Sequence, residues 1–185
     1  MTFITTASGR ELDFLNPDKS NIVLNDILIG LHKTSRFAGQ YEGDLYTVLE
    51  HSVLVYDILK LRQQEEYLLE GLLHDAHEAY TGDVPTPLKR LCADFENIEQ
   101  RLDKVIRMKY HLPPQMSQAV KEADRTALYI ESQKIKRCNS PVWEKYKTAD
   151  VDEIRKALPK EGTPLWDFRD NSSIIIVKDL ISQHL

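Results

Sequence analysis

The segment Leu72–Asp83 has the sequence LLHDAHEAYTGD, and it determines how the rest of the chain is interpreted. Its apolar run ends in an adjacent histidine and aspartate, His74 and Asp75, and Glu78 follows about one helical turn later. Burying an imidazole and an ionised carboxylate without partners costs on the order of several kcal/mol. A divalent metal ion is one partner that satisfies both groups, and this interpretation requires further ligands from elsewhere in the chain.

The length and charge of the chain limit the classes of protein to which it can belong. With 185 residues, one domain over 1–185 can bury an apolar core without disulfides or structural metals. A net charge of -5 argues against a duplex nucleic-acid binder, whose surface is basic. Cys92 and Cys138 fit neither a metal spacing nor a secreted disulfide framework, which favours free thiols in the cytoplasm. The sequence shows no export signal and no apolar run of about 18 residues, so no membrane span is expected.

Apolar periodicity predicts an all-α single domain, a helical bundle preceded by a short arm. Residues 3–14 alternate weakly around a glycine, which predicts a hairpin or an irregular extended arm. The expected helices begin near an N-cap at Asn25-Asp26 and cover approximately residues 26–34, 47–62, 65–81, a short segment through 91, 95–106, 116–130, 150–158 and 172–183.

A capping box places one histidine on a buried helix face. Thr47-Val48-Leu49-Glu50 has the capping-box pattern, with Thr47 as N-cap. His51 then lies in the first turn, on the same inward stripe as Val48 and Val55. A helical period also places Asp75 on the apolar face of the following helix, beside His74.

A further carboxylate, Asp124, lies within the apolar stripe predicted for residues 116–130. Taken alone, each candidate fits a half-buried histidine or a salt-bridged carboxylate. Together, two imidazoles and two carboxylates favour a divalent transition metal such as Mn, Co, Fe or Zn over Ca. The predicted metal ligands are His51, His74, Asp75 and Asp124.

Other polar and aromatic residues have simpler explanations. His77 points away from the face of Asp75 and is expected near solvent or behind the metal ligands. The basic residues Arg101, Lys104 and Arg107 recur at helical spacing, which predicts a solvated face. Both tryptophans, Trp143 and Trp166, are expected to pack within residues 140–185, where no catalytic pattern is evident.

Four segments, taken in order, resemble the H…HD…D signature of the HD-domain metal-dependent phosphohydrolases: Glu50-His51-Ser52, His74–Glu78, Thr81–Lys89 and Glu122-Ala123-Asp124. The Gly82–Lys89 run and Ser35-Arg36-Phe37 are more similar still to the bacterial HD-type 5'-deoxynucleotidases and their phage and prophage relatives. The resemblance covers roughly residues 25–130. It implies a helical bundle that binds one divalent metal through the four predicted ligands, and a homodimer.

The resemblance also implies roles for residues around the metal. Glu78 and Asp83 become candidates for handling the proton and positioning the attacking water or the leaving group, whereas otherwise they are a helix carboxylate and a turn or capping residue. Arg36 can grip phosphate oxygens, although a loop arginine is also a common surface residue. Phe37 replaces a tryptophan that in the deoxynucleotidases packs against the sugar. Lys89 either adds charge near the phosphate or is a solvated helix residue.

The expected function is therefore metal-dependent cleavage of deoxyribonucleoside 5'-monophosphates to nucleoside and phosphate. An alternative is a phage-type triphosphohydrolase that converts dATP to deoxyadenosine and triphosphate. A nucleotide-binding HD module without turnover is a third possibility, from a different class of protein. The sequence leaves open the base preference, the native metal and the number of metals.

Overall fold

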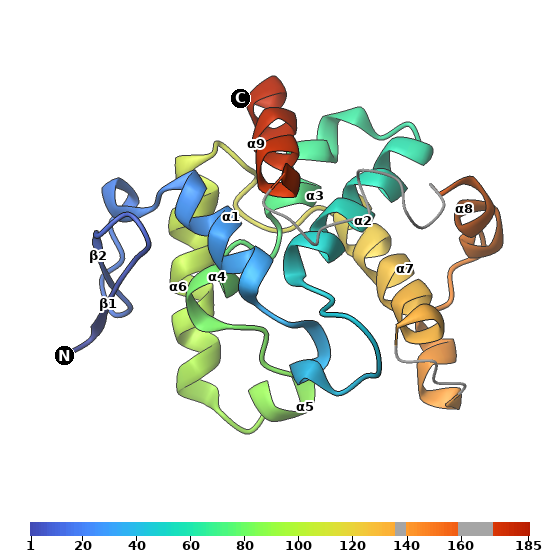
Figure 1. Ribbon diagram of the computed structural model, residues 1–185, viewed down its shortest axis with the longest axis horizontal. Coiled ribbons are helices and arrows are strands. Elements are labelled where there is room, and N and C mark those ends of the chain that lie inside the picture. Colours follow the sequence, from blue (N-terminus) through green and yellow to red (C-terminus); the bar gives the residue numbers. More distant parts are fainter. Residues whose placement is uncertain (136–139, 159–171) are drawn as a thin grey trace.

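Helices make up almost all of the regular structure in the described part of the chain. The computed structural model describes residues 1–135, 140–158 and 172–185. Its α-helices are α1 (Leu24–Lys33), α2 (Val48–Leu61), α3 (Leu68–Leu73), α4 (Glu78–Thr81), α5 (Thr86–Lys89), α6 (Ala93–Lys109), α7 (Gln118–Lys134), α8 (Val151–Ala157) and α9 (Ser172–His184). Its 3-10 helices are η1 (Lys19–Asn21), η2 (Arg36–Gly39), η3 (Glu65–Tyr67) and η4 (Pro141–Tyr146). The expectation of an all-α fold is confirmed for these residues (Figure 1).

The predicted N-terminal arm is an antiparallel hairpin. Strand β1 (Phe3–Thr5) pairs with β2 (Glu11–Asp13), and the hairpin lies at one edge of the molecule beside α6 (Figure 1). Leu12 on β2 is completely buried, so the hairpin contributes to the apolar core.

The first helix begins earlier than predicted, and Asp26, one of the two residues predicted to cap it, contacts the hairpin instead. Helix α1 begins after Val23, not at an Asn25-Asp26 cap, and no side chain caps it. The Asp26 carboxylate instead accepts hydrogen bonds from the backbone N–H and the hydroxyl of Ser8, at 2.8 and 2.7 Å. A residue type typical of helix caps is used here to attach the hairpin to α1.

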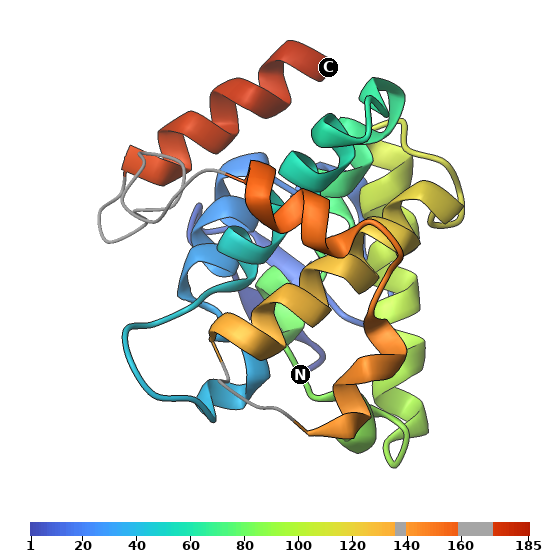
Figure 2. The ribbon, with the colours of Figure 1, turned by 90° about the vertical axis from the view of Figure 1, so that its right-hand side faces the viewer.

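Helix α2 lies between α3 and α7 at the centre of the fold (Figures 1 and 2). It begins at the predicted capping box: the Thr47 hydroxyl accepts from the Glu50 N–H at 3.3 Å, and the Glu50 carboxylate accepts from the Thr47 N–H at 2.6 Å. Because helices cover α2 from more than one side, its buried residues extend around most of its circumference. The first turn, which carries His51, is therefore held in the interior.

The prediction of one continuous helix over residues 65–81 is wrong, because the chain tightens at residues 74–77 between α3 and α4. The Gly71 carbonyl, which the next helical turn would use as an acceptor, accepts a hydrogen bond from His74 Nδ1 at 2.8 Å. Several backbone hydrogen bonds in this turn span three residues, as in a 3-10 helix. The histidine–aspartate pair thus lies in a tight turn between two short helices.

A glycine allows α1 and α4 to approach closely. A Cβ atom added at Gly30 would lie 2.5 Å from the carbonyl oxygen of Ala79 and 2.7 Å from its Cβ. These distances are too short for any side chain, and the nearest atom belongs to the backbone. Gly30 therefore sets the position of α4, the helix that begins with Glu78.

The predicted solvated face of α6 needs one correction. Arg101 and Lys104 are exposed, but the Arg107 side chain is only 2% exposed. Its guanidinium donates to the buried Glu70 carboxylate at 3.0 Å and to Asp103 at 2.8 Å. An arginine buried with a matched carboxylate joins α6 to α3, and helical spacing alone does not distinguish it from a surface residue.

The C-terminal helix α9 packs against α1 and α3. Trp166 and Cys138 lie outside the described residues. Within the described ranges, no helix has both the length and the apolar character needed to span a membrane.

Candidate metal centre

The four predicted metal ligands converge from α2, the turn after α3, and α7. His51 Nε2 lies 3.2 Å from His74 Nε2 and 3.1 Å from Asp124 Oδ1. Asp75 Oδ2 lies 3.2 Å from His74 Nε2 and 3.7 Å from His51 Nε2. Ligand atoms about 2.0–2.2 Å from a common ion lie about 3.3–3.6 Å apart in tetrahedral geometry, and about 3 Å (cis) or about 4.2 Å (trans) apart in octahedral geometry. His74 Nε2 and Asp124 Oδ1 are 4.0 Å apart. The spacing of His51, His74 and Asp124 therefore fits a single ion, and Asp75 Oδ2 lies close enough to both imidazoles to be a fourth ligand.

Hydrogen bonds fix the orientation of both imidazoles. His51 Nδ1 lies 2.6 Å from the carboxylate of Glu131, and His74 Nδ1 lies 2.8 Å from the Gly71 carbonyl. Both partners only accept, so each Nδ1 carries the proton and each Nε2 offers a lone pair in the neutral ring. Two lone pairs 3.2 Å apart repel each other unless a proton or a metal ion lies between them. This donor arrangement fits a divalent cation.

The carboxylates make the centre strongly attractive to positive charge. Burial lowers the pKa of His74, but Asp75 and Asp124 more than offset this effect and raise it to about 9. Burial raises the pKa of Asp75, but His74 and His51 hold it well below its usual range. Both imidazoles are fully buried, whereas the side chain of Asp124 is 37% exposed. The cluster is consequently closed behind the histidines and open on the side of the carboxylates.

Glu131 is a buried carboxylate that the sequence reasoning missed. It accepts from His51 Nδ1 at 2.6 Å, from Arg36 Nη2 at 3.0 Å and from the Tyr46 hydroxyl at 2.9 Å. Burial alone would raise its pKa, but Arg36 and His51 lower it to about 2, so the carboxylate is ionised. Glu131 follows Asp124 by seven residues, about two helical turns. His51 contacts both carboxylates, Asp124 through Nε2 and Glu131 through Nδ1. This spacing on one face of α7 was the available sequence signal.

Arg36 lies next to the predicted metal ligands and, together with Asp75 and Asp124, lines a cavity. Its guanidinium is buried against Glu131, and Nη1 is 3.8 Å from Asp75 Oδ2. Nε has no hydrogen-bond partner among the described residues. The alternative of a surface loop arginine is thus contradicted, because the side chain is only 9% exposed.

A left-handed turn follows Arg36. Phe37 and Ala38 have φ values of 55° and 52°, in a region that non-glycine residues rarely adopt. The Phe37 N–H donates to the Asp83 carboxylate at 3.2 Å. Asp83 therefore holds this strained turn beside the cavity, and a turn of this kind at a site that can bind a ligand is consistent with function.

Glu78 lies in a second group of charged residues next to the first. Its Oε1 is 3.3 Å from Lys89 Nζ, which is also 2.8 Å from Glu99. His77 Nε2 lies 3.5 Å from the same Glu99, so this half-buried histidine contacts α6. His77, Glu78 and Glu99 have the spacing of metal ligands, but the Lys89 ammonium already supplies a cation there.

The Glu78 carboxyl is suited to proton transfer. Burial raises its pKa well above the usual range, and the neighbouring carboxylates of Asp75 and Asp83 raise it further. Its Oε2 atom is buried and has no hydrogen-bond partner within the described part of the chain. The alternative of an exposed helix carboxylate is contradicted, since Glu78 is buried.

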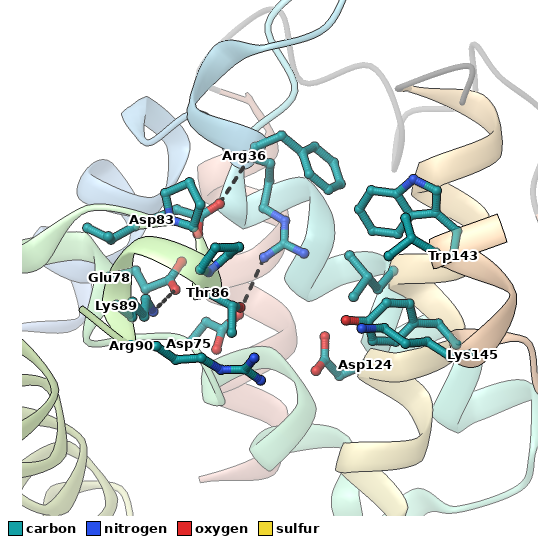
Figure 3. A pocket seen from close by; sticks show the side chains of 17 residues that line it. Arg36, Asp75, Glu78, Asp83, Thr86, Lys89, Arg90, Asp124, Trp143 and Lys145 are labelled. Carbon is teal, nitrogen blue, oxygen red and sulfur yellow. Dashed lines mark hydrogen bonds and ion pairs between the residues drawn. The ribbon is translucent and has the colours of Figure 1, made fainter. Parts of the chain in front are cut away.

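The cavity that Arg36 lines has a volume of about 500 Å³ and opens over two of the predicted metal ligands, Asp75 and Asp124. Figure 3 shows Arg36 extending into it, with Glu78, Asp83 and Lys89 on one side and Asp124 and Trp143 on the other. The charged lining residues are Arg36, Asp75, Glu78, Asp83, Lys89, Arg90, Asp124 and Lys145. Its apolar lining comes mainly from Phe37, Val84, Pro85, Pro87, Leu128, Val142, Trp143 and Tyr146.

All the residues predicted from the sequence to bind substrate or transfer protons line this cavity. The sequence does not predict the lining residues Val142, Trp143, Lys145 and Tyr146, and it predicts only a packing role for Trp143. No local pattern identifies these residues, since their position depends on how η4 packs against α7.

The fold and the site define a helical protein with a buried histidine and carboxylate cluster able to hold a metal ion. No protein-family profile matches the sequence. The chain is 38% identical over 159 residues to uncharacterized protein YfdR of Escherichia coli K12, and the alignment covers 86% of each chain. It is 34% identical over 137 residues to uncharacterized protein RCAP_rcc00048 of Rhodobacter capsulatus, covering 69% of this chain and 70% of that protein. The chain belongs to the same family as these two proteins.

Proposed function

We propose that this protein is an HD-type metal-dependent phosphohydrolase that cleaves deoxyribonucleoside 5'-monophosphates to nucleoside and phosphate. The observation that carries the proposal is the convergence of two buried imidazoles and two carboxylates beside a buried arginine. Of these residues, Arg36, Asp75 and Asp124 line one open cavity. The order of the motifs along the chain supports the HD type. The ligands would be His51, His74, Asp75 and Asp124.

A divalent transition metal held by these residues would polarise a phosphate oxygen and lower the pKa of a coordinated water. Mn, Co, Fe and Zn are all compatible with imidazole and carboxylate ligands. Glu131 would keep His51 in the tautomer that presents Nε2, as carboxylates behind metal-binding histidines commonly do.

Arg36 would bind the phosphate. Its guanidinium lies within 3.8 Å of Asp75, so a phosphate next to it is also next to the proposed metal ligands. A planar guanidinium can donate two parallel hydrogen bonds to phosphate oxygens. Asp83 would support this contact indirectly, by holding the backbone of Phe37.

Glu78 would take up or relay a proton during hydrolysis. Burial and negative neighbours raise the pKa of its carboxyl, which brings it closer to the pH at which proton transfer is efficient. Lys89 would limit this rise and hold the carboxyl in place, rather than bind phosphate on its own, because its ammonium already contacts Glu78 and Glu99.

The same cavity also supports a second substrate class. Arg90 and Lys145 line it and are exposed, and they would add positive charge for further phosphate groups near Asp75 and Asp124 (Figure 3). These cations favour the triphosphohydrolase alternative, in which dATP yields deoxyadenosine and triphosphate.

Product analysis tests the proposal. Protein stripped with EDTA and restored with Mn²⁺ or Co²⁺ is incubated with each deoxynucleoside monophosphate and, separately, with dATP. Metal-dependent release of phosphate and nucleoside from a monophosphate supports the main proposal, and triphosphate from dATP supports the alternative. No metal-dependent product from either substrate excludes both and leaves a binding module.

Two aspartate variants make the assay specific to the site. Asp75→Asn removes a proposed ligand and is expected to abolish turnover. Asp152→Asn makes the same chemical change at an exposed position on α8 that contacts only Arg155 among the described residues, so activity should persist.

A further inference from the structure

The structure shows an aromatic surface inside the charged cavity. One side of the cavity, which we call the aromatic wall, is lined by three aromatic and two aliphatic residues: Phe37, Trp143, Tyr146, Leu128 and Val142. Phe37 and Trp143 meet edge to face, with ring centroids 6.2 Å apart and planes at 90°. Trp143 also contacts Tyr146, at 5.9 Å between centroids. Phe37, Trp143 and Tyr146 are each only partly buried.

The aromatic wall adjoins the proposed phosphate site. The guanidinium carbon of Arg36 lies 5.5 Å from the centroid of the Phe37 ring, and Phe37 contacts Trp143. In Figure 3, Trp143 faces the cavity above Asp124, across from Glu78 and Lys89. A ligand whose phosphate is bound by Arg36 therefore has its organic part within reach of the wall.

Contacts with α7 fix the wall relative to the proposed metal ligands. The η4 helix, which carries Trp143, packs on α7, the helix of Asp124 (Figure 2). Arg125 donates to the Lys145 carbonyl, and the Tyr129 hydroxyl donates to Glu144 at 3.3 Å. η4 is thus attached along the helix that also bears a proposed metal ligand.

We propose that the aromatic wall binds the nucleobase of the substrate, with Trp143 as its main stacking residue. This inference rests on the proposed function and adds which part of the substrate the protein recognises, namely the base. Inorganic phosphate or a sugar phosphate would leave partly exposed aromatic surface in water, whereas a planar heterocycle would cover it. Aromatic side chains bind bases of any sequence through their faces, so the wall favours nucleotides without selecting one base.

A binding experiment tests the inference without depending on turnover. The chain has two tryptophans, so Trp166→Phe leaves Trp143 as the only tryptophan fluorophore. Glu78→Gln is added to suppress hydrolysis, and emission is followed with Zn²⁺ present. We expect dAMP and dTMP to change Trp143 emission saturably, and deoxyribose 5-phosphate and inorganic phosphate to leave it unchanged. Equal responses to the nucleotide and the baseless sugar phosphate, or no response to either, would overturn the inference.

Kinetics provide a readout that a merely structural tryptophan would not reproduce. Trp143→Ala should raise KM for dAMP about tenfold and leave KM for deoxyribose 5-phosphate within about twofold. Trp143→Phe keeps an aromatic face and should retain most of the affinity for dAMP. An equal loss for both substrates would mean that Trp143 only supports the fold.

The two experiments separate this inference from the proposed function. If no substrate is hydrolysed but dAMP changes Trp143 emission and deoxyribose 5-phosphate does not, the proposed function fails and the base site stands. If substrates are hydrolysed but Trp143→Ala changes KM equally for dAMP and deoxyribose 5-phosphate, the base site fails and the proposed function stands.

Discussion

Replacing Glu131 by glutamine tests whether this buried carboxylate prepares His51 for a metal. Glu131 accepts hydrogen bonds from three donors: the His51 imidazole, the Arg36 guanidinium and the Tyr46 hydroxyl. A glutamine has one acceptor oxygen and places an amide NH₂ where the second carboxylate oxygen was. At least one of the three donors then faces another donor, and Arg36 loses its buried counter-charge.

The size of the effect follows from these contacts. Loss of a carboxylate that orients a metal-binding histidine typically lowers metal affinity about 10- to 100-fold. Removing one partner of a buried ion pair costs about 3–5 kcal/mol, and the remaining Asp75 contact of Arg36 reduces this cost. Glu131→Gln should therefore weaken metal binding at least about tenfold and lower the midpoint of thermal unfolding.

The assay is a competition for Zn²⁺ with a chromophoric chelator, alongside thermal unfolding of the metal-free protein. Glu122→Gln provides a matched control, because Glu122 is an exposed residue of the same helix whose carboxylate contacts only Gln118 among the described residues. Folded Glu131→Gln protein that binds Zn²⁺ as tightly as the Glu122→Gln control would show that Glu131 does not prepare His51 for a metal.

Three further predictions concern stability. Arg107→Met leaves the buried Glu70 carboxylate without its counter-ion and should destabilise the fold by about 3–5 kcal/mol in urea denaturation, and a loss below about 1 kcal/mol would contradict the buried pair. Gly30→Ala forces α1 away from α4, so it should lower the free energy of unfolding by about 1–3 kcal/mol and reduce any activity that needs Glu78. A variant that unfolds and turns over substrate like the wild type would contradict the close approach of the two helices. The Arg62 side chain donates to the Asp150 carboxylate at 2.7 and 2.8 Å and lowers the pKa of Asp150. The stabilisation that this pair gives the folded protein is therefore present above the unfolded-state pKa of about 3.9 and is lost as the pH falls below that value. Asp150→Asn should thus destabilise by at most about 1 kcal/mol at pH 7, because the pair is partly exposed, and by less at pH 3; an equal effect at both pH values would contradict the pairing.

Local patterns were sufficient to predict the parts of the site that depend on short-range structure. The capping box at Thr47 and Glu50 fixes the start of α2 within four residues, so the inward direction of His51 follows from the helical period. The adjacent His74 and Asp75 were likewise recognisable, since an apolar run precedes them. The helical period wrongly predicts one continuous helix over this segment. The spacing of apolar residues carries no information about the hydrogen bond from His74 to the Gly71 carbonyl that accompanies the tight turn.

Long-range contacts account for what the sequence reasoning missed. The three partners of Glu131 lie 80 to 95 residues away along the chain, so no window of sequence contains the network. Arg107 has the spacing of a surface residue and is buried because Glu70 lies opposite it. Trp143 reaches the cavity only because η4 packs back onto α7, and its sequence context resembles that of a packing residue.

A cobalt titration of the metal-stripped protein, followed by phosphate release from dAMP, tests whether this site holds a metal ion that hydrolysis requires. We predict no release without metal, and release that rises with Co²⁺ and saturates near one ion per chain, as expected if His51, His74, Asp75 and Asp124 hold a single ion. The same rate of release in EDTA as in Co²⁺, or a rate that Co²⁺ restores equally in Asp75→Asn protein, would contradict metal-dependent hydrolysis at this site.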